Sequence, residues 1–137
     1  MNQRDEQLLA LRPTIPAASV TDSTSDEERF QNETLRPILK MQNPLLLALF
    51  RQHIQRRKNV FYQLPEPQRL SYVQQALQKD TTLRDTLKGV VIGHFTEVEW
   101  ERYAAMSGPL DKRLLQLATQ RLQSQLDALN NKLMSSE

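Results

Sequence analysis

Apolar residues recur along much of this chain at intervals of three and four positions, which is the spacing of one face of an α-helix. The pattern predicts helices over about 25–58, 65–79, 81–93, 96–106 and 110–133. We therefore expect an all-α protein, folded as a compact bundle of about five helices with a partly flexible N-terminal segment. The predicted boundary places the N-terminal segment and linker in 1–24 and the helical bundle domain in 25–137.

Residues that favour helix starts mark several of these boundaries. Ser25 with Glu28, and Thr96 with Glu99, have the spacing of a capping box. In that motif the first side chain accepts a hydrogen bond from the main chain three residues later, and the glutamate reaches back. Asp80 or Thr81 can cap the helix over 81–93.

Residues that interrupt helices lie at three places. Pro37 predicts a kink or a break, because proline lacks the amide hydrogen that a helix interior uses. Asn43 followed by Pro44 predicts a restart, with asparagine as the cap and proline at the first helical position. The sequence Ser-Gly-Pro at 107–109 predicts a stop followed by a new start.

The N-terminal segment combines a short predicted helix with a linker. Residues 5–11 can form a helix whose leucines at 8, 9 and 11 are available to dock. Two prolines and a crowd of Thr, Ser and Asp disfavour helix over 12–25, so we expect part of this stretch to be flexible.

The stretch 45–50 is apolar on every face. Such a helix must be buried all round, at the centre of a bundle or against a second subunit. The predicted helix over 110–133 also carries a long apolar stripe, at Leu115, Ala118, Leu122, Leu126, Leu129 and Leu133. That stripe can cover the bundle or pair with a partner helix. Both features predict self-association as a homodimer, with a different protein as the alternative partner. The candidate interaction residues are Leu45, Leu46, Leu49, Phe50, Leu122, Leu126 and Leu129.

Composition narrows the class of protein. The 137 residues suit one domain, and only 3 glycines argue against a loop-rich β fold. The absence of cysteine excludes a disulfide framework, a thiolate metal site and a cysteine nucleophile. The longest apolar run, 44–50, is too short to span a bilayer, and the first residues lack a secretory h-region. We therefore expect a cytoplasmic protein with no membrane partner.

A basic cluster near the end of the predicted helix supports nucleic-acid binding as an alternative function. Its members are Arg51, Arg56, Arg57 and Lys58, with Phe61 and Tyr62 close by. Basic and aromatic side chains together can grip phosphates and stack on bases. The formal net charge of +2 is small for a nucleic-acid binder, however, and cations at a helix C-terminus also offset the helix dipole.

A metal-dependent enzyme is the third hypothesis. His94, Glu97 and Glu101 are the best ligand-like trio, but a metal site requires three or four converging ligands. The simpler explanation places the histidine at a helix end and the carboxylates at the next helix start. With no glycine-rich phosphate loop, we expect no cofactor and assign no catalytic residue. The nearby aromatic residues are predicted to pack in the core: Phe95, Trp100 and Tyr103.

Three runs of the chain carry a family resemblance: DEERFQNETLRPILK at 26–40, VIGHFT at 91–96 and QRLQSQL at 120–126. They resemble a group of short bacterial proteins, mainly of Bacteroidetes type, with no established function. Similar sequences are sometimes labelled glyoxalase, a fold of paired βαβββ units that binds a divalent metal through His, Gln and Glu. This chain lacks that strand periodicity and ligand arrangement, so no catalytic residue is carried over. The resemblance implies a bacterial, cytoplasmic, helical protein.

The sequence therefore predicts a non-enzymatic interaction or structural module that self-associates. Nucleic-acid binding through the basic cluster and metal-dependent catalysis of the glyoxalase type are the alternatives from other classes.

Overall fold

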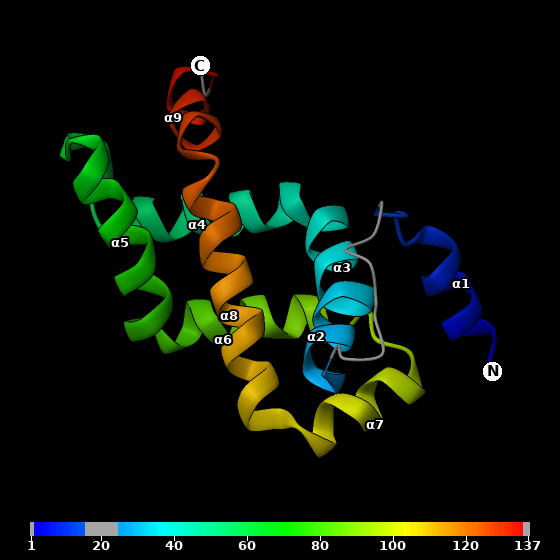
Figure 1. Cartoon of the computed structure of the whole chain (residues 1–137). Coiled ribbons are helices and arrows are strands. Elements are labelled where there is room, and N and C mark those ends of the chain that lie inside the picture. Colours follow the sequence, from blue (N-terminus) through cyan, green and yellow to red (C-terminus); the bar gives the residue numbers. More distant parts are fainter. Residues whose placement is uncertain (1, 16–24, 136–137) are drawn as a thin grey trace.

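The computed structural model describes residues 2–15 and 25–135, with side chains up to residue 130. Every element within these ranges is helical (Figure 1), which confirms the all-α prediction. The elements in chain order are α1 (Gln3–Leu11), α2 (Asp26–Phe30), η1 (Gln31–Leu35), α3 (Arg36–Met41), α4 (Asn43–Arg56), η2 (Val60–Gln63), α5 (Glu66–Lys79), α6 (Thr81–Ile92), α7 (Glu97–Ala105), α8 (Ser107–Gln123) and α9 (Leu126–Ser135). The expected flexible linker lies largely in 16–24, outside the described residues.

Helix α8 crosses the middle of the molecule, and elements from both halves of the chain pack around it (Figure 1). It contacts α5, α6, α7 and η1, while α4 and α6 pack against each other. The expected bundle of about five helices roughly matches this architecture, but the count differs because two predicted helices are each divided. Within the described ranges, none of the helices combines the length and hydrophobicity that a bilayer span requires.

Two aromatic clusters lie at opposite ends of the core. Phe30 of α2 meets Phe95 edge-on, with ring centroids 5.4 Å apart. At the other end Phe50 of α4 packs beside Phe61 and Tyr72, whose rings lie 5.3 Å from each other. Edge-on ring contacts add about 1 kcal/mol each beyond the burial of apolar area. Fully buried leucines lie between the clusters, among them Leu35, Leu46, Leu87, Leu110, Leu114 and Leu122.

A π-helical turn, η1, joins α2 to α3 directly before Pro37. The chain therefore continues as helix through the proline, and the predicted break becomes a local widening. Proline crowds the carbonyl four residues earlier and cannot donate to it, so a wider turn at this point accommodates its ring. The same turn buries Thr34 and Leu35.

Two predicted helix boundaries are corrected by side-chain amides. Gln42, and not Asn43, is the N-cap of α4. Asn43 instead exchanges two hydrogen bonds with the Gln125 amide, at 2.6 and 2.7 Å. The Gln125 side chain also donates to the Arg121 carbonyl at 2.9 Å, which its own main-chain amide would bond in a continuous helix. The helix predicted over 110–133 is therefore divided into α8 and α9.

Polar contacts hold α1 against the start of α7. Of the leucines predicted to dock, Leu9 and Leu11 are exposed and Leu8 is half-buried. Arg4 donates to the Phe95 carbonyl at 3.0 Å, and the buried Asp5 carboxylate accepts from the Glu97 amide at 3.2 Å. The docking of α1 is therefore directional, because each of these bonds requires a particular orientation of the helix.

A buried ion pair completes this attachment. Arg12 donates to Glu99 through two nitrogens, at 2.5 and 2.9 Å, and Glu99 is 8% exposed. Glu99 also accepts from the Thr34 hydroxyl and the Thr96 amide, both at 2.9 Å, and the Thr96 hydroxyl accepts from the Glu99 amide. The predicted capping box is thereby confirmed. Burial opposes ionisation of Glu99, but the hydrogen bonds from Arg12 and Thr96 outweigh it and lower the pKa.

Substitution Glu99→Gln should lower the free energy of unfolding at pH 7 by about 3 kcal/mol, because the Arg12 guanidinium is left buried without a counter-charge. Since the folded-state pKa lies below the ordinary 4.5, this stabilisation is complete above that pH and is lost as pH falls through the folded pKa. Urea unfolding across this pH range measures both effects. Asp85→Asn, at an exposed position of α6 outside both this site and α7, is the control and should change stability by less than about 0.5 kcal/mol. An unchanged acid dependence in Glu99→Gln would contradict the assignment.

Helix α4 ends in a Schellman turn that places a lysine where glycine is usual. Lys58 and Asn59 have φ values of 62° and 61°. The Asn59 amide donates to the Ile54 carbonyl at 3.0 Å, and the Lys58 amide donates to the Gln55 carbonyl at 3.1 Å. A side chain with a Cβ costs about 1 kcal/mol or more in this left-handed conformation.

Substitution Lys58→Gly should raise the free energy of unfolding by about 0.5–1 kcal/mol, because glycine adopts this conformation without the steric cost. Urea denaturation measures the change. Lys112→Gly is the control, because it removes the same side chain from an exposed position in the right-handed helix α8. It should lower the free energy of unfolding by about 1 kcal/mol. Equal losses in the two variants would show that the turn at Lys58 stores no steric cost.

Candidate functional site

Most of the predicted interaction residues lie in the core of their own chain. Leu46, Phe50, Leu122 and Leu129 are fully buried, and Leu126 is nearly so. Helices of the same chain cover these side chains, so a partner cannot reach them while the fold is intact. As far as Leu129, the long stripe of the C-terminal region is thus used for intramolecular packing. Leu133 lies outside the residues whose side chains the structure describes.

The remaining two predicted residues lie on the outer side of α4. Leu45 is 43% exposed and Leu49 is half-buried, so the chain by itself does not bury 45–50 on every side. Burial of the uncovered side against a second subunit stays a prediction. A single chain of this size covers only one side of the helix. Leu45, Leu49, Gln52 and Arg56 follow one another at helical spacing along the uncovered side. We call these four residues the α4 face.

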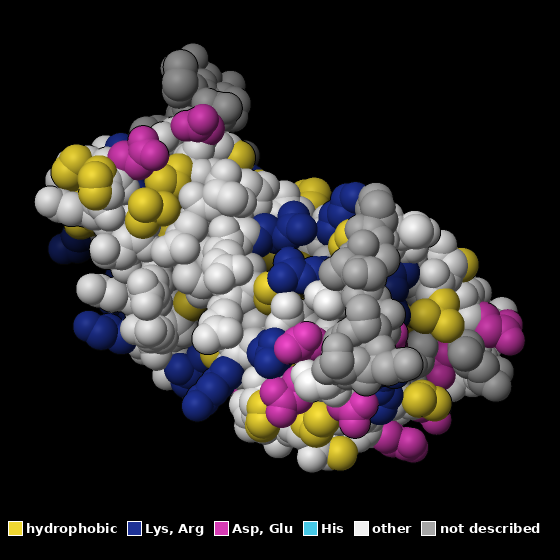
Figure 2. Space-filling model, viewed as in Figure 1, with side chains coloured by type: hydrophobic (Ala, Val, Ile, Leu, Met, Phe, Trp, Pro, Cys, Tyr) yellow, Lys and Arg dark blue, Asp and Glu magenta, His cyan; other side chains and the backbone are white. Residues whose placement is uncertain are grey.

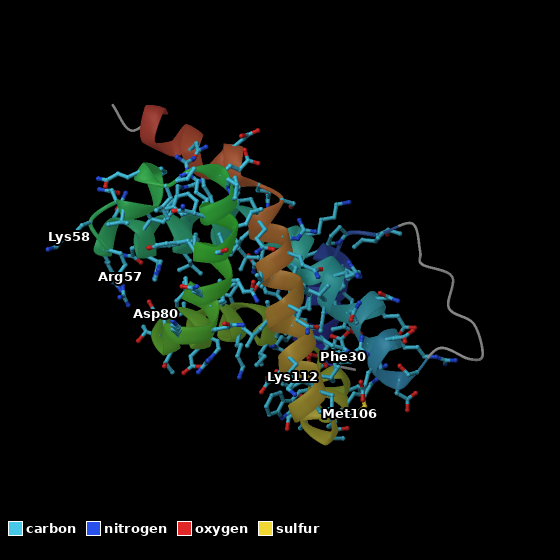
Figure 3. All side chains as sticks on the ribbon, turned by 60° about the vertical axis from the view of Figure 1, so that its left-hand side comes forward. Phe30, Arg57, Lys58, Asp80, Met106 and Lys112 are labelled. Carbon is cyan, nitrogen blue, oxygen red and sulfur yellow. The ribbon has the colours of Figure 1, made fainter. Side chains whose placement is uncertain are left out.

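The predicted basic cluster is only partly brought together. Arg57 and Lys58 project at the exposed end of α4 (Figure 3), where Arg56 is also exposed. Arg51 points elsewhere, with Nη1 3.4 Å from the Ala128 carbonyl. The two aromatic residues expected next to the basic cluster make contacts within the chain. Phe61 is fully buried, and the Tyr62 hydroxyl donates to the Leu129 carbonyl. The two aromatic residues expected beside these cations are therefore not presented as fully exposed rings.

A second exposed surface lies on α7. Val98 is 62% exposed and Trp100 is 49% exposed. On the helix they flank the neighbouring exposed carboxylates of Glu97 and Glu101, one on each side. Figure 2 shows acidic and hydrophobic side chains together along this edge of the molecule, where α7 and the start of α8 lie. We call Glu97, Val98, Trp100 and Glu101 the α7 face.

Trp100 corrects the prediction that all three aromatic residues of this region lie in the core. Phe95 and Tyr103 are buried, but Trp100 stacks on the outer side of Tyr103, with centroids 6.0 Å apart. Acidic residues on both sides of Trp100 were the available sequence signal that this part of α7 is exposed.

The predicted metal trio does not converge. Glu97 accepts from the Asn2 amide at 2.7 Å, and Nε2 of His94 is in close contact with the Gln42 amide. Burial lowers the pKa of His94, and the charges of Arg12 and Arg4 lower it further. Among the described residues, no group of three His, Cys, Asp or Glu side chains could hold a metal ion.

His53 and Asp80 form a histidine–carboxylate pair that sequence analysis did not find. Nδ1 of His53 lies 2.8 Å from Oδ2 of Asp80, and His53 is only 7% exposed. Asp80 also caps α6 by accepting from the Leu83 amide, as its predicted role required. Burial lowers the pKa of His53 even though Asp80 raises it, so the ring is neutral at pH 7 with its proton on Nδ1.

The pair leaves Nε2 of His53 able to accept a proton. The Tyr72 hydroxyl lies 3.5 Å from Nε2, and the pair borders a hollow of about 470 Å³. Arg57 and Lys79 also line that hollow, and two cations disfavour a metal ion there. The geometry thus supplies an oriented base without an aligned nucleophile.

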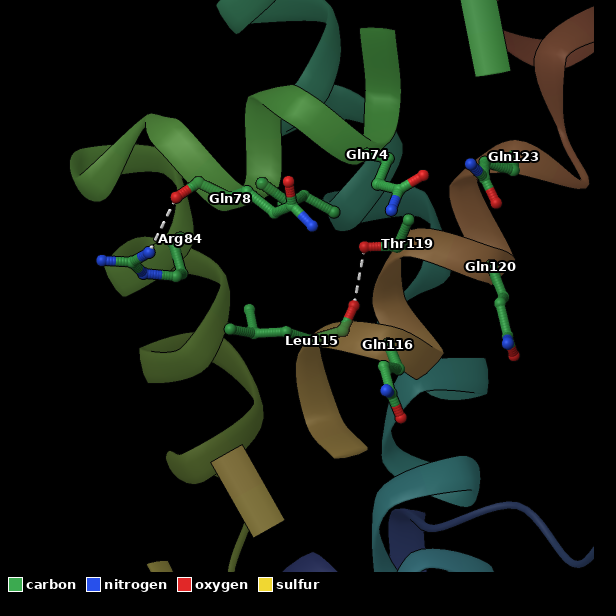
Figure 4. Close-up of a pocket in the computed structure, with 9 residues that line it drawn as sticks. Gln74, Gln78, Arg84, Leu115, Gln116, Thr119, Gln120 and Gln123 are labelled. Carbon is green, nitrogen blue, oxygen red and sulfur yellow. Dashed lines mark hydrogen bonds between the residues drawn. The ribbon is translucent and has the colours of Figure 1, made fainter. Parts of the chain in front are cut away.

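A further hollow, of about 440 Å³, lies between α5, α6 and α8 and is lined largely by amides (Figure 4). Its hydrogen bonds run to the main chain, from Arg84 to the Gln78 carbonyl and from the Thr119 hydroxyl to the Leu115 carbonyl. Apart from Arg84, the lining residues are uncharged, so the hollow has no group suited to acid–base chemistry. The amides are Gln74, Gln78, Gln116, Gln120 and Gln123.

Comparison with known proteins gives no match. No family model, no curated protein and no solved structure matches the chain. The bacterial family resemblance therefore stays a prediction.

Substitution Asp80→Asn should lower the pKa of His53 further below 6.5, because the hydrogen bond and charge of Asp80 both raise it. Asparagine retains the cap on α6, so the fold should be kept. NMR titration of the His53 ring protons measures the change. Asp85→Asn, at an exposed position of α6, is the control and should leave the titration unchanged. A wild-type His53 that titrates at or above 6.5 would contradict the assignment.

Proposed function

We propose that this chain is a non-enzymatic interaction module that self-associates, with the α7 face of one copy bound to the α4 face of another. The observation that carries the proposal is that the two exposed helix faces have opposite charge and each expose bulky apolar side chains.

The apolar part of the contact joins Trp100 and Val98 to Leu45 and Leu49. An exposed tryptophan that is already stacked on a buried ring loses little side-chain entropy when it binds. Tryptophan is also enriched among the residues that dominate binding energy in protein interfaces. Of the seven predicted interaction residues, the proposal therefore keeps Leu45 and Leu49 and leaves out the five that are buried in the core.

The charged part of the contact joins Glu97 and Glu101 of the α7 face to Arg56 of the α4 face. Opposite charges across an interface select the orientation and speed the encounter, and their effect weakens as salt is added. Two copies related by a twofold axis make the same contact twice, which gives a closed homodimer.

Charge reversal tests the pairing directly. Glu101→Lys and Arg56→Glu should each weaken self-association by about tenfold or more, because each places like charges opposite one another. An equimolar mixture of the two variants should associate again, since the reversed charges then face each other. Sedimentation velocity over a range of concentrations at low salt measures all three samples.

Two variants with the same charge change elsewhere serve as controls. Asp85→Lys and Lys112→Glu lie at exposed positions outside both faces and should self-associate like the wild type. A wild-type chain that stays monomeric at every concentration would refute self-association. Failure of the mixture to associate would refute the pairing of these two faces.

Nucleic-acid binding is a second candidate, supported by the three exposed cations Arg56, Arg57 and Lys58 at one end of α4. The same variants separate the two functions. Arg56→Glu should weaken salt-sensitive binding to DNA or RNA, whereas Glu101→Lys should not. Loss of self-association in both variants, without nucleic-acid binding by the wild type, favours the interaction module.

A further inference from the structure

A small hollow of about 270 Å³ lies between α3 and α8, and none of its lining residues belongs to either proposed interaction face. Arg36 enters it from α3 and Arg121 enters it from α8, above two buried leucines. Figure 2 shows Lys and Arg side chains gathered in this central part of the surface. The lining residues are Arg36, Leu39, Leu117, Gln120, Arg121 and Ser124.

The two guanidinium groups line the same hollow, and the charge of Arg36 disfavours the charge of Arg121. Burial lowers the pKa of the half-buried Arg121, and the charge of Arg36 lowers it further. No acidic residue lines the hollow, and within residues 2–15 and 25–130 neither guanidinium has an ion-pair partner. Like charges held together in this way repel, and a bound anion would remove the repulsion.

Neutral amides hold the arginine side chains in position without neutralising them. The Asn43 oxygen lies 3.5 Å from Nη1 of Arg121, and Asn43 is itself fixed by its paired hydrogen bonds with Gln125. Nε of Arg36 donates to the Asn32 oxygen at 3.1 Å, which leaves its two terminal nitrogens available. Most of the donors of the two guanidiniums therefore remain unused.

We infer that this hollow binds a small dianion of the phosphate class, held between Arg36 and Arg121. Two guanidiniums match the charge of a phosphate dianion, and their planar forks can each donate two parallel hydrogen bonds to its oxygens. The volume is below the range of about 300–1,000 Å³ typical of drug-sized ligands, which favours inorganic phosphate or a small phosphate monoester. The inference does not depend on self-association.

Isothermal titration calorimetry at constant ionic strength tests the site with inorganic phosphate, methyl phosphate and acetate as separate probes. One phosphate should bind per chain and raise the melting temperature, and acetate should bind more weakly because it carries one charge. Arg36→Gln and Arg121→Gln should each weaken phosphate binding by about tenfold or more. Lys112→Gln removes one positive charge from the same helix as Arg121 and should leave binding unchanged. If methyl phosphate binds as inorganic phosphate does, the site accepts phosphate monoesters. If only inorganic phosphate binds, the site is specific for the free ion.

The stability of the phosphate-free variants distinguishes a binding site from a structural one. Removal of either arginine relieves the repulsion, so both glutamine variants should melt no lower than the wild type in chloride buffer. Circular dichroism confirms that they are folded, and Arg121→Lys keeps the charge but should still weaken binding because it loses the fork. Absence of phosphate binding, or equal binding by the wild type and both glutamine variants, would overturn the inference.

Discussion

A buried carboxylate has to be met by donors from every side, and the one on Glu99 is met by three separate parts of the chain. Arg12 reaches it from beyond α1, Thr34 from the π-helical turn, and Thr96 from the start of its own helix. A leucine in the same place could be covered by many arrangements of these segments, whereas the ionised group accepts only a few. The position of α7 is therefore defined by polar geometry, and so is the outward direction of Trp100.

The opposite end of the molecule is organised in a similar way around Asp80. Its carboxylate begins α6 and also fixes the ring of His53 on α4. Helix α6 thus runs from one carboxylate contact toward the other, with leucines and phenylalanines filling the space between. Apolar cores tolerate substitutions that conserve volume, while hydrogen-bonded carboxylates do not. Both proposed interaction faces lie on helices that these carboxylates position.

Local signals in the sequence were enough to predict the helices and several of their ends. Ser25, Asp80 and Thr96 cap helices as predicted, because a cap depends only on residues three positions away. The Arg12–Glu99 pair joins residues 87 positions apart, and no local pattern records such a contact. The same limit applies to Leu45 and Leu46, adjacent leucines of which one is exposed and one is buried, since only the packed neighbours decide between them.

The side-chain amide of Gln125 shows how little is needed to change a helix end. Periodicity predicted one long helix, yet at the division the Arg121 carbonyl accepts from the side chains of Ser124 and Gln125 and not from the Gln125 main-chain amide. The arginine pair between α3 and α8 was hidden for a related reason. Arg36 and Arg121 each occupy a polar position that is ordinary for its own helix. They meet only because α3 and α8 pack against the same hollow.

The π-helical turn before Pro37 also sets the phase of the chain. A π turn contains about one residue more than an α turn. Compared with a regular α-helix of the same residues, the part before the turn is therefore rotated by about 100° about the helix axis relative to α3. Phe30 reaches the aromatic cluster with Phe95 only with that rotation in place. If the same residues were wound as a regular α-helix, the one extra residue would turn Phe30 away from this cluster by about 100°. The irregular turn is thus the part of this helix that keeps its two halves in register with two different sets of neighbours.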